Sequence, residues 1–144
     1  MKQAATLSNK ELYEAIRDCQ LDPEGFDHEA HIRLAWYYLA HWPYDRALQK
    51  FKHDFKRFVV NAGAAGKYHR TITDALLQLI ASHLHDEKCR LDWDYFKQDA
   101  APLFTDAYGL LQRYYSSALL ESKTARKTFK KPDKADLPAP YNPA

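Results

Sequence analysis

Three histidines stand where their side chains could share one binding pocket. His28 and His31 are three residues apart, and His69 opens a later apolar segment. At about 100° per residue, an α-helix places His28 and His31 on the same face as Ile32. Neutral imidazole nitrogens are ligands for zinc, iron, copper and nickel. The sequence therefore predicts a site for one of these divalent transition metals at His28, His31 and His69.

A small anion is the alternative occupant of this pocket. Asp27 stands at the N-cap position before the histidine pair, which places both imidazoles in the first turns of a helix. The N–H groups at a helix start favour an anion and disfavour a cation. Thr71 and Thr73, near the start of a second helix, would assist in binding a phosphate or carboxylate. A third interpretation leaves all three histidines purely structural.

Four main helices must position these residues. Ser8 and Glu11 have the spacing of a capping box and open the first helix, which runs to about Gln20. The other three are expected at about 27–42, after Pro43, and at 67–84. Short loops make neighbouring helices antiparallel, so the second and fourth helices begin at the same end of the bundle. The imidazoles at their starts should then converge.

The remaining segments complete an all-α, single-domain bundle. We expect a polar loop at 85–88, a short helix from Asp92 to Gln98 and a longer helix from about Thr105. The domain spans residues 1–128, and a Pro- and Lys-rich extended tail covers 129–144, which either packs across the bundle or stays mobile. The basic residues of the third helix are interpreted as a solvated face: Lys50, Lys52, Lys56 and Arg57.

Composition excludes several classes of protein. The 21 basic and 19 acidic residues among 144 are scattered and give a net charge of +2, without the basic stripe of a nucleic-acid-binding protein. No apolar run approaches the roughly 18 residues that a membrane span needs. Two cysteines are too few for a disulfide framework, and no leader pattern opens the chain, so we expect a cytoplasmic protein.

Two motifs resemble a family of short, uncharacterised bacterial all-helical proteins. The first is F-x-H-x-x-H-x-R-x-A-W from Phe26, and the second is G-K-Y-H-x-T-x-T from Gly66. The resemblance covers most of the chain in the same order and implies functional positions at Arg33, Tyr68 and Arg126, besides the histidines and threonines. A likeness to DinB-type metal hydrolases, which hold three histidines inside a four-helix bundle, is one of architecture only.

The leading hypothesis is a metal-binding helical protein that acts on a small molecule as a hydrolase or oxygenase. Tyr68, Thr73 and Arg126 would orient the substrate or the metal ligands. The alternatives are a non-catalytic binding module for a small anionic metabolite and a protein interaction domain.

Overall fold

Helices form all the regular elements in the part of the chain that the structure describes. The computed structural model of the protein describes residues 1–143, apart from the side chain of Lys67. No strand occurs in this range, so the predicted all-α class is confirmed. Within the same range, no helix combines the length and apolar character needed to cross a membrane. Backbone contacts separate an N-terminal unit, Met1–Lys67, from a C-terminal unit, Tyr68–Pro143.

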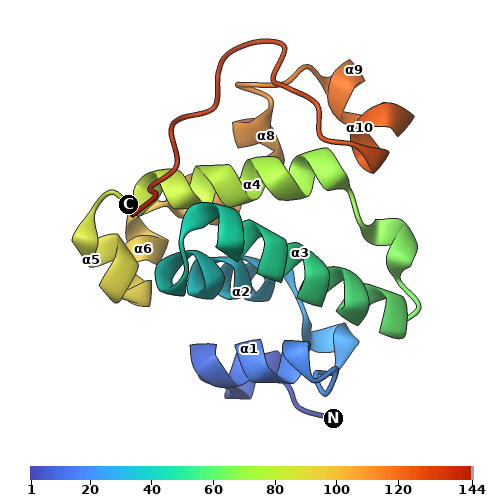
Figure 1. The fold of residues 1–144 in the computed structure, drawn as a ribbon, viewed down its shortest axis with the longest axis vertical. Helices are drawn as coiled ribbons and strands as arrows, with labels where there is room; N and C mark the ends of the chain where they lie inside the picture. The colour runs from blue at the N-terminus through green and yellow to red at the C-terminus, as the bar shows by residue number, and fades with distance from the viewer. Residues whose placement is uncertain (144) are drawn as a thin grey trace. The chain divides into compact units, whose positions relative to one another are not determined.

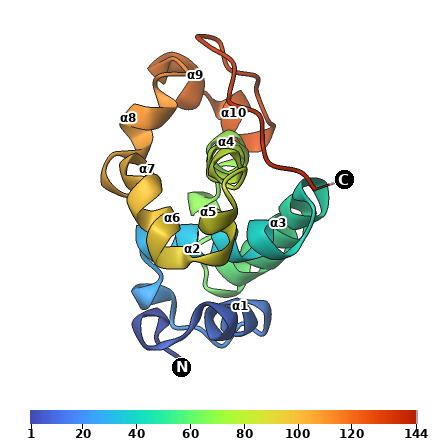
Figure 2. The ribbon, with the colours of Figure 1, turned by 90° about the vertical axis from the view of Figure 1, so that its left-hand side faces the viewer.

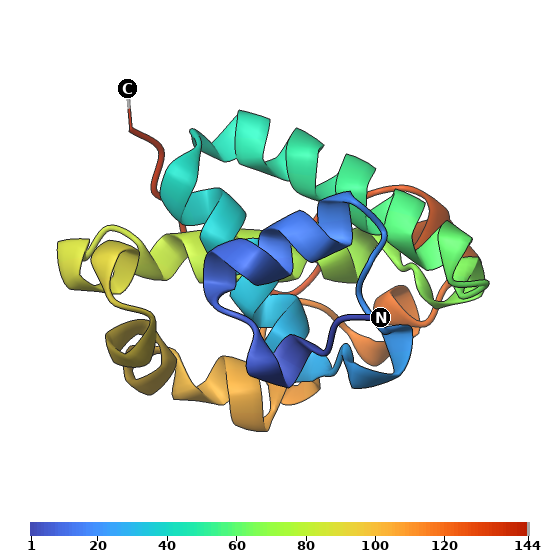
Figure 3. The same ribbon diagram turned by 90° about the horizontal axis from the view of Figure 1, so that it is seen from below.

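The N-terminal unit is built on three α-helices, each of which packs against the other two (Figure 3). The predicted capping box of Ser8 and Glu11 is confirmed, and the Asp27 carboxylate caps the next helix by accepting from the Ala30 N–H. The core combines aliphatic side chains with aromatic ones, of which Tyr38 and Phe51 are fully buried. In chain order the elements are η1 (Ala4–Thr6), α1 (Asn9–Arg17), η2 (Pro23–Gly25), α2 (His28–His41), α3 (Tyr44–Asn61) and η3 (Ala65–Lys67).

Helix α2 differs from the prediction in how it is buried. Helical spacing predicts one core-facing stripe that contains His28, His31, Ile32, Ala35, Leu39 and Trp42, but His28 is exposed. Leu34, Trp36 and Tyr38, which lie outside that stripe, are buried. A helix covered on most of its circumference has no single apolar stripe, so periodicity alone cannot orient its first turn.

The C-terminal unit is organised around α4, which is likewise buried on several sides, from Thr71 and Thr73 to Ala75 and Leu77. The His69 side chain caps this helix, so it begins at Arg70 rather than at the predicted Lys67. Figure 2 shows α4 nearly end-on, with the later helices and the tail of the unit around it. The elements are α4 (Arg70–His83), α5 (Glu87–Leu91), α6 (Trp93–Asp99), α7 (Ala101–Thr105), α8 (Ala107–Leu111), α9 (Ser117–Leu120) and α10 (Lys123–Lys127).

The prediction of one long helix from about Thr105 is wrong. The segment forms short helices, because Asp106, Ser116 and Ser122 each turn a side-chain oxygen onto a backbone N–H and open a new helix. The predicted polar loop at 85–88 is confirmed for His85 and Asp86 only, since Asp86 caps α5 in the same way and residues 87–88 are helical. The short helix capped by Asp92 is confirmed.

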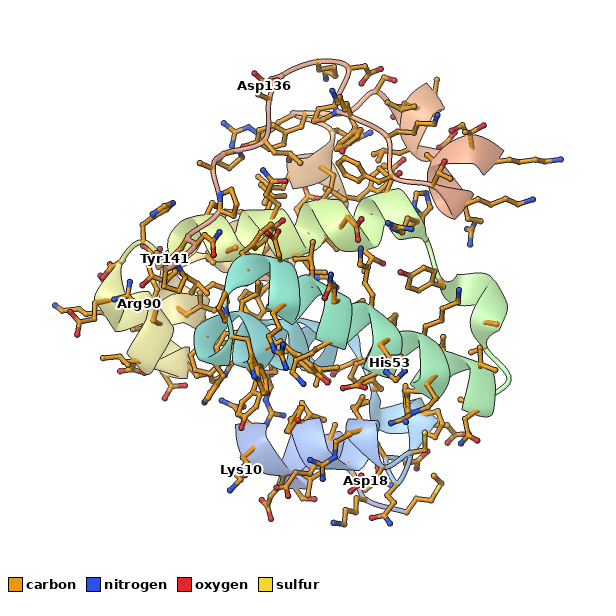
Figure 4. All side chains as sticks on the ribbon, viewed as in Figure 1. Lys10, Asp18, His53, Arg90, Asp136 and Tyr141 are labelled. Carbon is orange, nitrogen blue, oxygen red and sulfur yellow. The ribbon has the colours of Figure 1, made fainter. Side chains whose placement is uncertain are left out.

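The tail packs against the C-terminal unit and belongs to it. After α10 it turns back and runs along α4 towards α5 (Figure 1). The Tyr141 N–H donates to the Ala81 carbonyl over 3.0 Å. The Arg90 guanidinium lies 4.4 Å from the centroid of the Tyr141 ring, and the two side chains meet in Figure 4. Residues 129–143 of the predicted tail therefore belong to a folded unit.

Candidate functional site

His31 lies in a stack of aromatic rings within the N-terminal unit. Its ring is nearly parallel to that of Phe51, at 4° and 5.6 Å between centroids, and lies 4.7 Å from that of Phe55. Phe26 approaches at 5.8 Å. Burial lowers the pKa of His31 to about 4, with a smaller contribution from His28. His31 is therefore neutral at physiological pH.

His69 serves as a structural cap of the C-terminal unit. Its Nδ1 accepts from the Ile72 N–H over 3.0 Å, and its Nε2 lies 2.8 Å from the Leu120 carbonyl oxygen. This pair of contacts requires the neutral tautomer with the proton on Nε2, which donates to Leu120. Both ring nitrogens are thus engaged, and a metal would have to displace one of these bonds.

Three other predicted residues meet His69 near the start of α4, where they hold the later segments. The Thr71 hydroxyl is fully buried, donates to the Thr128 carbonyl over 2.9 Å and accepts from the Lys130 N–H over 3.0 Å. The Arg126 guanidinium donates to the Tyr68 carbonyl over 3.3 Å. Burial raises the pKa of Tyr68. These contacts attach α10 and the tail to α4.

The remaining predicted site residues, Arg33 and Thr73, occupy structural positions within their own units. The Arg33 guanidinium holds the start of the chain, donating to the carbonyls of Ala4 and Leu7 and to the Asn9 side chain. Thr73 is buried in α4. Among residues 1–143, no group of three or more His, Cys, Asp or Glu side chains is placed to hold a metal ion. The three-histidine pocket would draw on both units and stays a prediction.

A groove between α1 and α3 is the best candidate site that the structure itself presents. We call it the basic groove; it lies within the N-terminal unit and encloses about 450 Å³. Figure 4 marks its surroundings with His53 on α3 and Asp18 at the end of α1. Four cationic side chains and one carboxylate line it, and Arg17 among the cations pairs with Asp18 at 3.1 Å. The lining residues are Tyr13, Arg17, Arg46, Gln49, Lys50, His53, Asp54 and Arg57.

Helical spacing explains how α3 supplies most of this lining. Arg46, Lys50, Asp54 and Arg57 are separated by four, four and three residues, so they share one face of the helix. Arg57 fixes α3 to α1 by donating to the Arg17 carbonyl. The Lys50 ammonium lies 4.9 Å from the centroid of the Trp42 ring. The three cations of α3 thus lie along one wall of the groove, and Arg17 of α1 lies on the other.

A chain of polar contacts leads from the core to the floor of the groove. The phenol of Tyr38, fully buried in α2, donates to Oδ2 of Asp54. Oδ1 of Asp54 lies 3.1 Å from Nδ1 of His53, whose side chain is 72% exposed. Burial, and then the hydrogen bond to Asp54, raise the pKa of Tyr38 well above its usual range, so the phenol remains a donor. Asp54 thereby orients an exposed imidazole.

Sequence reasoning missed the basic groove because it interpreted the basic face of α3 as solvated. The spacing of Arg46, Lys50, Asp54 and Arg57 was a usable signal. The opposite wall, formed by Tyr13 and Arg17 of α1, comes from tertiary packing that periodicity does not reveal.

Comparisons with known proteins add no functional assignment. No family model matches the chain, and neither the curated proteins nor the solved structures contain a match. The resemblance to short bacterial helical proteins therefore stays a prediction. Any function has to follow from the side chains of the site.

Proposed function

We propose that the protein is a binding module for a small anionic metabolite that carries a phosphate group, held in the basic groove of the N-terminal unit. The observation that carries the proposal is the excess of cations there: Arg46, Lys50 and Arg57 line the groove with a single carboxylate, Asp54, whereas Arg17 is paired with Asp18. Its volume of about 450 Å³ suits a small molecule.

Chemistry favours phosphate over other anions. Guanidinium groups bind phosphate oxygens in pairs of parallel hydrogen bonds, and an ammonium adds a compact charge. Arg46 and Lys50, one turn apart on α3, can contact the same group. Tyr13 and Gln49 offer polar contacts to the rest of the ligand.

The test is a titration with inorganic phosphate at constant ionic strength, followed by NMR of backbone amides. We expect saturable shifts in α1 and α3, and at least a tenfold loss of affinity in the double variant Arg46→Gln, Lys50→Gln. Each charge-assisted hydrogen bond contributes about 1.5–3 kcal/mol to binding. The loss of both side chains should therefore weaken phosphate binding by more than tenfold.

A matched pair of substitutions provides the control. Lys52→Gln with Lys56→Gln removes the same charge from the same helix, and neither residue lines the groove. We expect less than a twofold change in phosphate affinity. Equal losses in the two double variants would show general charge attraction instead of a site, and so would the absence of saturable shifts in the unmodified protein.

A further inference from the structure

The imidazole of His53, which lines the basic groove, has the features of a reactive nucleophile. We propose that Nε2 of His53 accepts a phosphoryl group from a small, activated phosphate donor bound in the groove. This inference rests on the proposed function and extends it from binding to group transfer. It depends on three observations: the orientation of the ring, its exposure and the cations beside it.

Asp54 determines which ring nitrogen can react. The 3.1 Å contact between Oδ1 of Asp54 and Nδ1 of His53 requires the proton on Nδ1, because a carboxylate only accepts. In the neutral ring the lone pair then belongs to Nε2, on a side chain that is 72% exposed. The Tyr38 phenol holds the other oxygen of Asp54, so the carboxylate is itself fixed. Asp54 and Tyr38 are thus positioning residues.

The surrounding cations would stabilise the transferring group. Phosphoryl transfer passes through a loose transition state whose charge is spread over three equatorial oxygens, so its catalysis depends on positioning and on nearby positive charge. Arg46 and Lys50 line the same groove as His53. They can bind the donor and keep its phosphorus near Nε2.

The transfer balances without a further reactant. With phosphoramidate protonated on its nitrogen as the donor, the Nε2 lone pair forms the N–P bond while the P–N bond of the donor breaks, and neutral ammonia leaves with that electron pair and its three protons. The Nδ1 proton stays on the ring, hydrogen-bonded to Asp54. An acyl phosphate would react in the same way, with a carboxylate as the leaving group.

A second histidine–carboxylate pair provides an internal control. Nδ1 of His83 lies 2.9 Å from Oδ2 of Asp99, so this ring is oriented as His53 is. The same carboxylate oxygen also accepts from the Cys89 thiol, and none of these residues lines the basic groove. His83 therefore tests carboxylate orientation without the cationic groove. His41 is exposed on α2 and its Nδ1 lies 2.7 Å from the Tyr37 carbonyl oxygen, so it tests exposure and the same tautomer without a carboxylate or the basic groove.

The experiment incubates the full chain with phosphoramidate and measures the phosphorylation rate of each histidine by mass spectrometry under non-acidic conditions. We expect His53 to react at least tenfold faster than His83 and His41. The double variant Arg46→Gln, Lys50→Gln should bring His53 down to the rate of His41, which is also exposed, whereas Lys52→Gln with Lys56→Gln should not. In Asp54→Asn, long-range ¹⁵N NMR should show the proton moving from Nδ1, together with slower labelling of His53.

The outcomes separate the inference from the proposed function. Saturable phosphate shifts with His53 labelled no faster than His83 would overturn the phosphoryl-acceptor role and leave the binding module standing. Uniform labelling of all exposed histidines, without saturable phosphate shifts, would overturn both. Fast labelling of His53 that is unchanged in Asp54→Asn and in the Arg46, Lys50 double variant would also overturn the inference, because the groove would then contribute nothing.

Discussion

A chain that ends at Thr128 is expected to lose most of the stability of its C-terminal unit. Residues 129–143 supply the Lys130 carbonyl to the fully buried Tyr115 hydroxyl, and the Lys130 N–H to Thr71. Asp133 accepts two hydrogen bonds from Ser116. At about 1 kcal/mol for each lost bond, and more for the buried Tyr115 hydroxyl left without its partner, the total is about 5 kcal/mol, which is comparable to the whole stability of a domain.

Hydrogen exchange of the α4 amides measures this loss, together with the thermal unfolding transition. Unchanged protection of α4 in the shortened chain would show that the tail only adheres to the surface.

A point substitution refines the test: Thr71→Val keeps the shape of the side chain but leaves the Thr128 carbonyl and the Lys130 N–H without the hydroxyl that they contact. Thr105→Val, at an exposed hydroxyl bonded to the Ala101 carbonyl, is the matched control and should change stability by less than about 0.5 kcal/mol.

The main helices could be predicted because their signals are local. Ser8 with Glu11, Asp27, Pro43 and Asp92 each mark a helix end through chemistry contained within a few residues. The prediction for the segment after Thr105 was wrong because it followed the apolar spacing and overlooked signals that are equally local. The apolar spacing of the segment suggests one helix, but the capping side chains of Asp106, Ser116 and Ser122 open several short ones.

The candidate site was less predictable because its partners are distant in sequence. A histidine on an apolar segment can be a ligand, a cap or a member of an aromatic stack, and only the neighbours decide which. His69 bonds to Leu120, which lies 51 positions away. His31 stacks on Phe51 and Phe55 of the next helix. Conversely, His53 offers no motif, and its role emerges only when α1 completes the basic groove.

Acidification from pH 6.5 to pH 4 is expected to destabilise the N-terminal unit by about 3 kcal/mol through His31. Burial lowers the pKa of this ring from 6.5 to about 4 in the folded protein. Between pH 6.5 and pH 4 the His31 imidazole is protonated in the unfolded chain but neutral in the folded chain. Unfolding therefore takes up a proton, and the free energy of unfolding falls as the pH falls. The stability that the neutral His31 ring contributes is fully present above pH 6.5 and is lost progressively as the pH falls towards 4.

Substitution isolates this effect from the other titrating groups. His31→Phe keeps an aromatic ring beside Phe51 and Phe55 but cannot be protonated, so urea unfolding monitored by the NMR signals of α2 should lose the pH dependence in this window. His41→Gln, at an exposed histidine of the same helix, should retain the wild-type slope. Carboxylates whose pKa is lowered in the fold, such as Asp22 and Asp133, lose their contribution only below about pH 4. A wild-type slope that persists in His31→Phe would therefore assign the acid sensitivity to another group, and would mean that the aromatic stack accommodates an imidazolium.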